Sequence, residues 1–131
     1  MAVSTAPQSA TLGPLRMIPR HRVALLDGAP VHLSRTEYDV LYALAKRRGE
    51  VVSIYDLEAA AWVPNHFSRA TIVQSGRWGN GVTGTHLSHA IRVNISRLRR
   101  RLGAHAWLIQ AVPGFGYRID LESIRARAGA S

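Results

Sequence analysis

The stretch SHAIRVNISRLRRRLG, residues 88–103, constrains the fold more than any other part of the chain. Its large aliphatic residues recur at the i, i+4, i+7 and i+11 positions, which share one side of an α-helix because successive residues turn by about 100°. These residues are Ile91, Ile95, Leu98 and Leu102. The spacing predicts a helix over 87–102 that ends at Gly103 and packs this apolar side against a core.

The opposite side of the predicted helix is polar and basic. A helical wheel places on it His89, Val93, Ser96, Arg97 and Arg100, with Arg92 and Arg99 at one margin and Arg101 at the other. No acid lies at the i±3 or i±4 positions, where a merely solvated basic face usually finds ion pairs. Such a helix fits the major groove of DNA, about 12 Å wide, with marginal arginines on phosphates and the central strip on base edges. Arg97 is the candidate for a bidentate guanine contact, and Val93 for contact with a thymine methyl group.

Charge is distributed unevenly along the 131 residues, whose formal net charge is +9. Between Ala59 and Ile119 there is no Asp or Glu, although this segment holds eight arginines. Arginine makes forked contacts to phosphate, so an acid-free, arginine-rich half predicts a surface for a polyanion. The alternative that composition leaves open is a basic face that only keeps the protein in solution.

Several function classes are not predicted. The chain has no cysteine, which excludes disulfide scaffolds, cysteine-ligated zinc sites and thiol nucleophiles. No apolar run approaches the roughly 18 residues of a membrane helix, and the N-terminus does not read as a signal peptide, so we expect a cytoplasmic protein with no membrane contact. His86 and His89 have the spacing of two metal ligands, but only His66 could add a third, so no metal or cofactor is expected. No catalytic set or phosphate-binding glycine motif is present, so no enzyme is expected.

Turn and capping signals predict the elements that precede the arginine-rich helix. Asp27-Gly28 between VALL and APVHL is typical of a tight hairpin, and 15–19 supplies a further strand. Ser34 followed by Glu37 forms a capping box at the start of a helix that ends at KRRG.

The remaining segments complete the predicted order. A second helix begins at Ser53, contains IYDLEAAAW and stops before Pro64. Segment 63–87, with GRWGNGVTG, predicts a long loop between helices. After the third helix, AWLIQAV and YRIDL predict two strands around PGFG, and hence a hairpin.

This order of elements predicts an α+β fold with an N-terminal antiparallel sheet, three helices and a C-terminal β-hairpin. We expect one domain over 14–121, in which 63–87 is the long inter-helix loop. A flexible lead over 1–13 and a flexible tail over 122–131 are expected on either side of it.

Three segments, LSRTEYDVLYALAKRRGEVVSIYDLEAAAW, IRVNISRLRRRLG and IQAVPGFGYRI, together resemble the winged-helix DNA-binding domain of OmpR/PhoB-type response regulators. The resemblance covers residues 15–121 and implies a winged helix-turn-helix, with helix 87–102 in the major groove and the wing, 107–121, at the minor groove. The recognition-helix contacts that it implies are His89, Ala90, Arg92, Asn94, Ser96, Arg97 and Arg99. The helical wheel, by contrast, puts Asn94 at the edge of the core.

Three departures from the family pattern change these expectations. The family usually begins with a phosphorylatable receiver domain, for which this chain has no room, so we expect a stand-alone regulator or a receiver on a partner. Arg92 stands where the family often has an acid, so the DNA target should differ. Pro113 stands where the wing usually carries an arginine. Arg118 and the main chain around Gly114 are expected to provide a weaker wing contact.

The resemblance also implies partners besides duplex DNA. The family's loop between the second and third helices commonly touches RNA polymerase, and the partner-binding candidates here are Phe67, Arg69, Arg77 and Trp78. The alternative is that Trp78 packs onto its own domain. Family members often bind tandem sites as pairs, which implies a homodimer on tandem half-sites, although no dimer seam is legible in the sequence.

The sequence therefore predicts a sequence-specific, double-stranded DNA-binding regulator of transcription. Its affinity is expected to come from Arg92, Arg97, Arg99, Arg100 and Arg101. One alternative is a protein–protein adaptor that contacts RNA polymerase or another regulator through the 63–87 loop, with mainly non-specific DNA affinity. The other is an RNA-binding module, which would usually offer exposed aromatic side chains for stacking. Most aromatic residues here fall at core-like positions.

Overall fold

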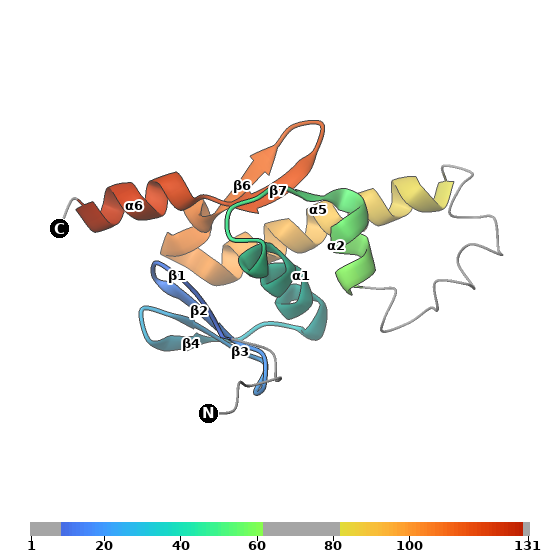
Figure 1. The fold of residues 1–131 in the computed structure, drawn as a ribbon. Helices are drawn as coiled ribbons and strands as arrows, with labels where there is room; N and C mark the ends of the chain where they lie inside the picture. The colour runs from blue at the N-terminus through green and yellow to red at the C-terminus, as the bar shows by residue number, and fades with distance from the viewer. Residues whose placement is uncertain (1–8, 62–81, 130–131) are drawn as a thin grey trace, which may run out of the picture.

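The computed structural model describes residues 9–61 and 82–129 of the chain. In these residues, two antiparallel sheets lie on opposite sides of a group of helices (Figure 1). The N-terminal sheet has four strands and the C-terminal sheet three. The predicted α+β class and the winged helix-turn-helix architecture are confirmed.

The N-terminal sheet consists of β1 (Ala10–Leu12), β2 (Leu15–Ile18), β3 (Val23–Leu26) and β4 (Ala29–Val31), in that order. Asp27 and Gly28 join β3 to β4 with φ angles of 50° and 83°, the two positive values that a type I′ hairpin turn requires. Leu15, Met17 and Ala24 are buried, so one face of this sheet contributes to the core.

Strand β1 corrects the prediction of a flexible lead over 1–13. Leu12 pairs with Leu15 across a turn formed by Gly13 and Pro14, and both Ala10 and Leu12 are buried. A strand of three residues offers too little alternation to be recognised from sequence, because its pairing with β2 is what defines it.

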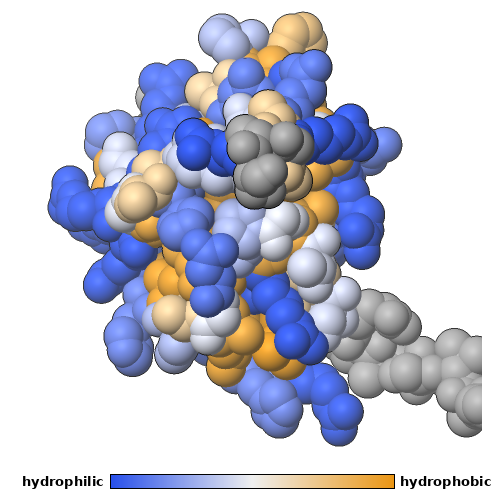
Figure 2. Space-filling model, turned by 90° about the vertical axis from the view of Figure 1, so that its left-hand side faces the viewer, coloured by the Kyte–Doolittle hydropathy of each residue, from blue (hydrophilic) through white to orange (hydrophobic). Residues whose placement is uncertain are grey.

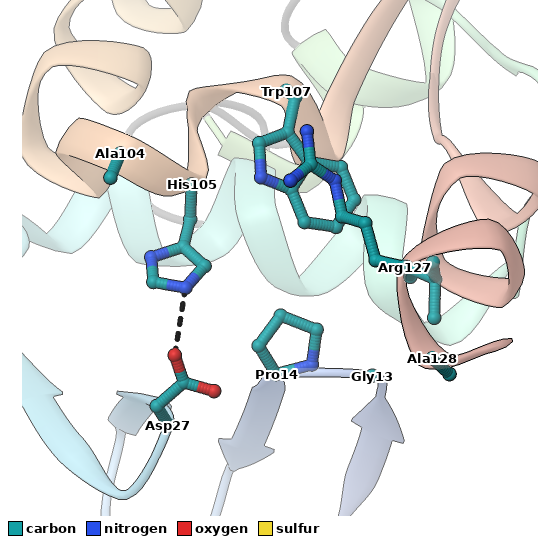
Figure 3. Close-up of a pocket in the computed structure, with 9 residues that line it drawn as sticks. Gly13, Pro14, Asp27, Ala104, His105, Trp107, Arg127 and Ala128 are labelled. Atoms are coloured by element: carbon teal, nitrogen blue, oxygen red, sulfur yellow. Dashed lines mark hydrogen bonds and ion pairs between the residues drawn. The ribbon is translucent and has the colours of Figure 1, made fainter. Parts of the chain in front are cut away.

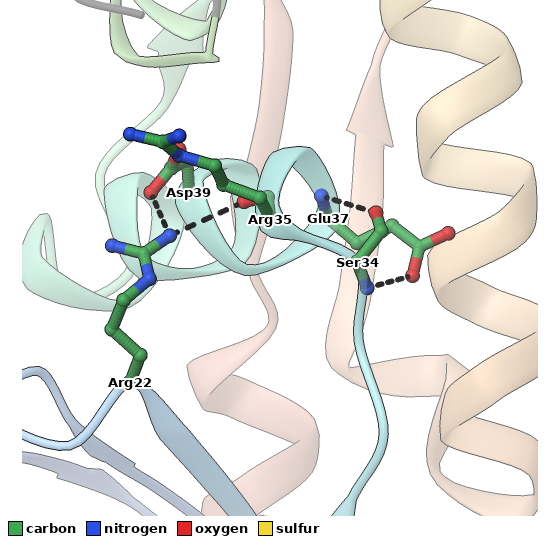
Figure 4. A network of polar contacts seen from close by, with 5 residues as sticks. All are labelled: Arg22, Ser34, Arg35, Glu37 and Asp39. Atoms are coloured by element: carbon green, nitrogen blue, oxygen red, sulfur yellow. Dashed lines mark hydrogen bonds and ion pairs between the residues drawn. The ribbon is translucent and has the colours of Figure 1, made fainter.

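Helix α1 (Arg35–Lys46) begins at the predicted capping box (Figure 4). The Ser34 hydroxyl oxygen accepts a 3.1 Å hydrogen bond from the Glu37 N–H, and the Glu37 carboxylate accepts one of 2.8 Å from the Ser34 N–H. Arg22, in the connection between β2 and β3, pairs with Asp39 at 2.8 Å. The start of α1 is therefore tied to the N-terminal sheet.

The helical layer is completed by α2 (Ile54–Ala61) and α5 (Val82–Leu102). The Ser53 hydroxyl oxygen accepts a 3.1 Å hydrogen bond from the Asp56 N–H, as expected of a residue that begins a helix. Helix α5 begins at Val82 and not at Leu87, so the helix includes the last residues of the predicted 63–87 loop.

The wing hairpin consists of β6 (Ile109–Val112) and β7 (Gly116–Ile119). Strand β5 (Val52–Ser53) joins it in a three-stranded sheet with the order β5, β7, β6. The hairpin predicted around PGFG is confirmed. The first part of AWLIQAV, however, is not a strand, because residues Gly103–Leu108 form a 3-10 turn, η1. Gly116 is needed in this sheet, since a Cβ there would collide with the backbone oxygen of Val52.

Helix α6 (Leu121–Gly129) corrects the prediction of a flexible tail over 122–131. Asp120 caps its first turn by accepting hydrogen bonds from the Ser123 N–H at 3.1 Å and the Ser123 hydroxyl at 2.7 Å. These bonds lower the pKa of the Asp120 carboxyl.

Gly13 and Gly49 allow side chains of α6 to approach the backbone closely. A Cβ at Gly13 would lie 2.6 Å from the Ile124 side chain, and a Cβ at Gly49 would lie 2.6 Å from that of Leu121. The helix therefore packs on the β1–β2 turn and on the end of α1.

The fully buried core side chains come from both sheets and from all three helices of the central layer. They include Leu15, Met17, Leu41, Leu44, Leu57, Ile91, Ile95, Leu98, Leu108 and Ile119. None of the helices that the structure describes is long and apolar enough to cross a bilayer.

Candidate nucleic-acid interface

The two faces of α5 differ as its sequence predicts. The predicted apolar side is buried, with Ile91, Ile95, Leu98 and Leu102 at most 3% exposed. The exposed residues from 89 onward are His89, Arg92, Ser96, Arg97, Arg100 and Arg101. The helix is thus fixed by its core side and leaves a basic side in solvent.

Three of the arginines on this side have no acidic partner in the part of the chain that the structure describes. Within residues 9–61 and 82–129, no carboxylate pairs with Arg92, Arg97 or Arg100. Arg97, Arg100 and Arg101 line a surface hollow of about 520 Å³. Two of these three, Arg97 and Arg100, have no described carboxylate beside them, so the hollow favours the binding of an anion. Phosphate matches the forked geometry of a guanidinium group.

Arg99 and Arg101, both predicted to contribute to DNA affinity, also make contacts within the domain. An Nη atom of Arg99 donates a 3.0 Å hydrogen bond to the carbonyl oxygen of Ile109, the first residue of β6. Nε of Arg101 lies 3.3 Å from Oε1 of the buried Glu37. A helical wheel shows neither contact, because both partners come from other elements.

The wing residue Arg118 also makes a side-chain hydrogen bond within the domain. Its Nε donates a 2.6 Å hydrogen bond to the side-chain oxygen of Gln110 on the neighbouring strand. Arg118 and Gln110 are both half-buried. The pair fixes the Arg118 side chain on the surface of the wing.

Asn94 does not share the outer face of the helix. It is 7% exposed, and within the described part of the chain its side-chain oxygen has no hydrogen-bond partner. This burial agrees with the position at the edge of the core and gives no support to the DNA contact that the family resemblance implies. Ala90 and Val93 are half-buried.

The predicted partner-binding residues lie in a different part of the chain from the basic side of α5. Phe67, Arg69, Arg77 and Trp78, predicted to bind a partner, lie outside the described residues. So does His66, and the side chain of His86 is not described. Among the side chains that are described, no group of three His, Asp or Glu residues could hold a metal ion.

Sequence reasoning missed Glu58, a buried acid in α2. Glu58 is 1% exposed, and one of its carboxylate oxygens has no hydrogen-bond partner among the described residues. Burial raises its pKa to about 7. Its place at helical spacing between Ile54 and Ala61 could have indicated burial, because i, i+4 and i+7 share one face.

Sequence reasoning also missed two exposed aromatic side chains. Among the described residues, the exposed large hydrophobic ones are Tyr55, which is 71% exposed, and Phe115, which is 70% exposed. Tyr55 lies in the first turn of α2, and Phe115 lies at the tip of the wing. The position of Phe115 between two glycines of a predicted turn is the signal that could have identified it.

A second hollow, of about 490 Å³, lies where α6 and η1 meet the turns of the N-terminal sheet (Figure 3). The Arg127 guanidinium stacks 4.0 Å from the centre of the Trp107 ring. Nε2 of His105 lies 2.9 Å from Oδ2 of Asp27.

The face of the molecule seen in Figure 2 carries apolar surface between hydrophilic side chains.

Comparison with known proteins places this arrangement in a family, although no family model matches the chain. The response regulator protein PmrA of Pseudomonas aeruginosa is 33% identical over 108 residues, which are 82% of this chain and 40% of that protein. The transcriptional regulatory protein CutR of Streptomyces coelicolor is 31% identical over 105 residues, 80% of this chain and 40% of its own length. The chain therefore spans about 40% of the length of these relatives.

Solved structures share the fold. The DNA-binding domain of CpxR from E. coli superposes with a TM-score of 0.62 at 26% identity, and the match covers 86% of this chain and 96% of that domain. The DNA-binding domain of RstA from Klebsiella pneumoniae, solved in complex with the RstA box, has a TM-score of 0.61 at 24% identity, covering 88% and 99%. With these relatives and this fold, the chain belongs to the OmpR/PhoB-type family of winged-helix response-regulator effector domains.

Proposed function

We propose that this chain is a sequence-specific, double-stranded DNA-binding regulator of transcription. Recognition helix 87–102, within α5, lies in the major groove, and the wing, 107–121, lies at the minor groove. The observation that carries the proposal is the outer side of α5, where Arg92, Arg97 and Arg100 are exposed without any described carboxylate beside them. The DNA complexes of related domains, among them RstA with the RstA box, support the same reading.

Each arginine has a role that follows from its position. Arg97 lies near the middle of the exposed side and reads a base, because a guanidinium can donate two hydrogen bonds to guanine. Arg92 and Arg100 bind phosphates. Arg101 lines the hollow together with Arg97 and Arg100, while its Nε remains paired with the Glu37 carboxylate.

Selection of bound duplexes from a random DNA pool at about 150 mM salt tests the proposal, because specific binding survives ionic strengths that weaken phosphate contacts. We expect one or two enriched half-sites. On the enriched duplex, the logarithm of the binding constant should fall with that of the salt concentration, with a slope near −0.9 for each phosphate neutralised.

Arg97→Ala should then relax the preference at one base position and cost about 1–3 kcal/mol of binding free energy. Arg125→Ala is the matched control, since it removes the same charge from an exposed position on another helix, α6. Enrichment of no motif would contradict the proposal and favour the adaptor alternative, in which the basic helix binds phosphates without reading bases. An unchanged preference in Arg97→Ala would contradict the assignment of the base reader.

A further inference from the structure

The tip of the wing is a rigid and uncharged turn. The Phe115 N–H donates a 3.0 Å hydrogen bond to the carbonyl oxygen of Val112. Gly114 has a φ of 84°, and Pro113 precedes it, as in a type II turn. Proline at the second position and glycine at the third favour this geometry before any partner binds.

The turn presents Phe115 to solvent. The side chain is 70% exposed, and Pro113 beside it is also exposed. In Figure 1 the loop between β6 and β7 stands clear of the helices. Exposure of a phenylalanine side chain to water is unfavourable compared with its burial. Because its position at the tip leaves the ring exposed, burial against another molecule would be favourable.

The wing also holds a fixed position relative to α5. Arg99 of α5 donates its hydrogen bond to Ile109 at the base of β6, and Gly116 packs closely on the backbone of Val52. The tip therefore moves together with the recognition helix. A molecule bound by α5 contacts Phe115 at a fixed position relative to that helix.

The surroundings of the tip favour DNA over an acidic or apolar protein as that molecule. No acid occurs between Ala59 and Ile119, and the basic side of α5 belongs to the same rigid unit. Proteins that bind the minor groove often place apolar side chains, phenylalanine and proline among them, against a base step and bend the duplex there.

We propose that Phe115 is an apolar wedge that enters the minor groove and partly unstacks one base step beside the major-groove site. This inference rests on the proposed function and adds a residue that selects DNA by its deformability. Pyrimidine–purine steps unstack most easily, so such a step is expected under the tip.

The experiment uses the duplex enriched with the full chain, labelled with 2-aminopurine at successive positions and with a dye pair at its ends. The wild-type protein should raise 2-aminopurine fluorescence at one step and shorten the end-to-end distance. Phe115→Ala should abolish both changes and weaken binding about 10-fold, because an apolar contact with one base step is lost. Phe115→Leu should retain them in large part.

Tyr55→Ala is the matched control, since it removes an equally exposed aromatic side chain from α2. The inference is overturned if the wild-type protein binds its duplex without either signal, or if Tyr55→Ala lowers the signals as much as Phe115→Ala. It is also overturned if Phe115→Ala binds as tightly as the wild type, which would assign the exposed ring to a protein partner. Failure of the wild type to select any duplex would instead contradict the proposed function itself.

Discussion

Arg101 and Glu37 join the end of α5 to the beginning of α1. Nε of Arg101 lies 3.3 Å from Oε1 of Glu37, and the same oxygen accepts the 2.8 Å hydrogen bond from the Ser34 N–H. The Glu37 side chain is 3% exposed, whereas that of Arg101 is 51% exposed. One buried carboxylate thus caps one helix and holds the other, so two adjacent arginines, 100 and 101, differ in role.

Replacement of these neighbours by alanine should separate stability from binding. Arg101→Ala leaves the buried Glu37 carboxylate without its cation, and we expect it to lower the free energy of unfolding by about 1 kcal/mol. Arg100→Ala removes an exposed side chain and should change stability by less than ~0.5 kcal/mol, while it weakens DNA binding. Urea unfolding followed by circular dichroism, with DNA titration at several salt concentrations, measures both effects. Equal stability of the two variants would contradict a structural role for the Arg101 contact.

Glu58 should make stability depend on pH. Burial raises its pKa from 4.5 to about 7 in the folded protein, so the folded chain binds a proton that the unfolded chain releases between these values. The contribution of Glu58 to the free energy of unfolding should therefore be greatest below pH 4.5, fall as the pH rises towards 7, and decrease by at most about 3 kcal/mol in total.

Variants at position 58 test the same linkage. Glu58→Leu should unfold at a higher urea concentration than the wild type above pH 7, because no carboxylate is then buried. Glu122→Gln changes an exposed acid and is expected to leave the wild-type pH dependence in place. The pH dependence of Glu58→Leu reports the contribution of all other groups. If the wild type and Glu58→Leu show the same change in stability between pH 4.5 and pH 7, the prediction is contradicted.

Gly13 should be more sensitive to substitution than Gly28. Both have positive φ, 58° and 83°, so alanine introduces comparable backbone strain of about 1 kcal/mol at each. At Gly13 the new Cβ would also meet the Ile124 side chain at 2.6 Å, whereas nothing lies within 4 Å at Gly28. Gly13→Ala is therefore expected to cost about 1–2 kcal/mol more in unfolding free energy.

A chain shortened to end at Asp120 provides the control for this comparison. Without α6, Gly13→Ala and Gly28→Ala should have the same effect on thermal unfolding. A larger cost of Gly13→Ala that persists in the shortened chain would show that Ile124 is not its cause.

The elements that the sequence predicted correctly have local signals. The capping box of Ser34 and Glu37, the Asp27-Gly28 turn and the spacing of the α5 aliphatics each act within a few residues, so no knowledge of the tertiary structure is needed. The elements that were missed depend on distant contacts. Strand β1 needs β2, and α6 needs the surface around Gly13.

The candidate site was predictable in outline and not in detail. Helical periodicity separates the buried side of α5 from the exposed side, and it did so correctly. It does not show which arginine meets a group from another element. The contacts of Arg99 with Ile109 and of Arg101 with Glu37 join residues ten and more positions apart, and the sequence contains no local sign of either.

The strand between α1 and α2 has a consequence for the DNA that this domain accepts. Val52 and Ser53 pair with Tyr117 and Gly116, so the chain that leads into α2 belongs to the same sheet as the wing. Backbone hydrogen bonds therefore hold the wing beside the start of α2, and α2 in turn packs on α5. Under the proposed mode of binding, with α5 in the major groove and the wing at the minor groove, a site whose grooves are spaced differently must itself deform to make both contacts. The mechanical properties of the DNA would then enter the choice of target alongside its base sequence.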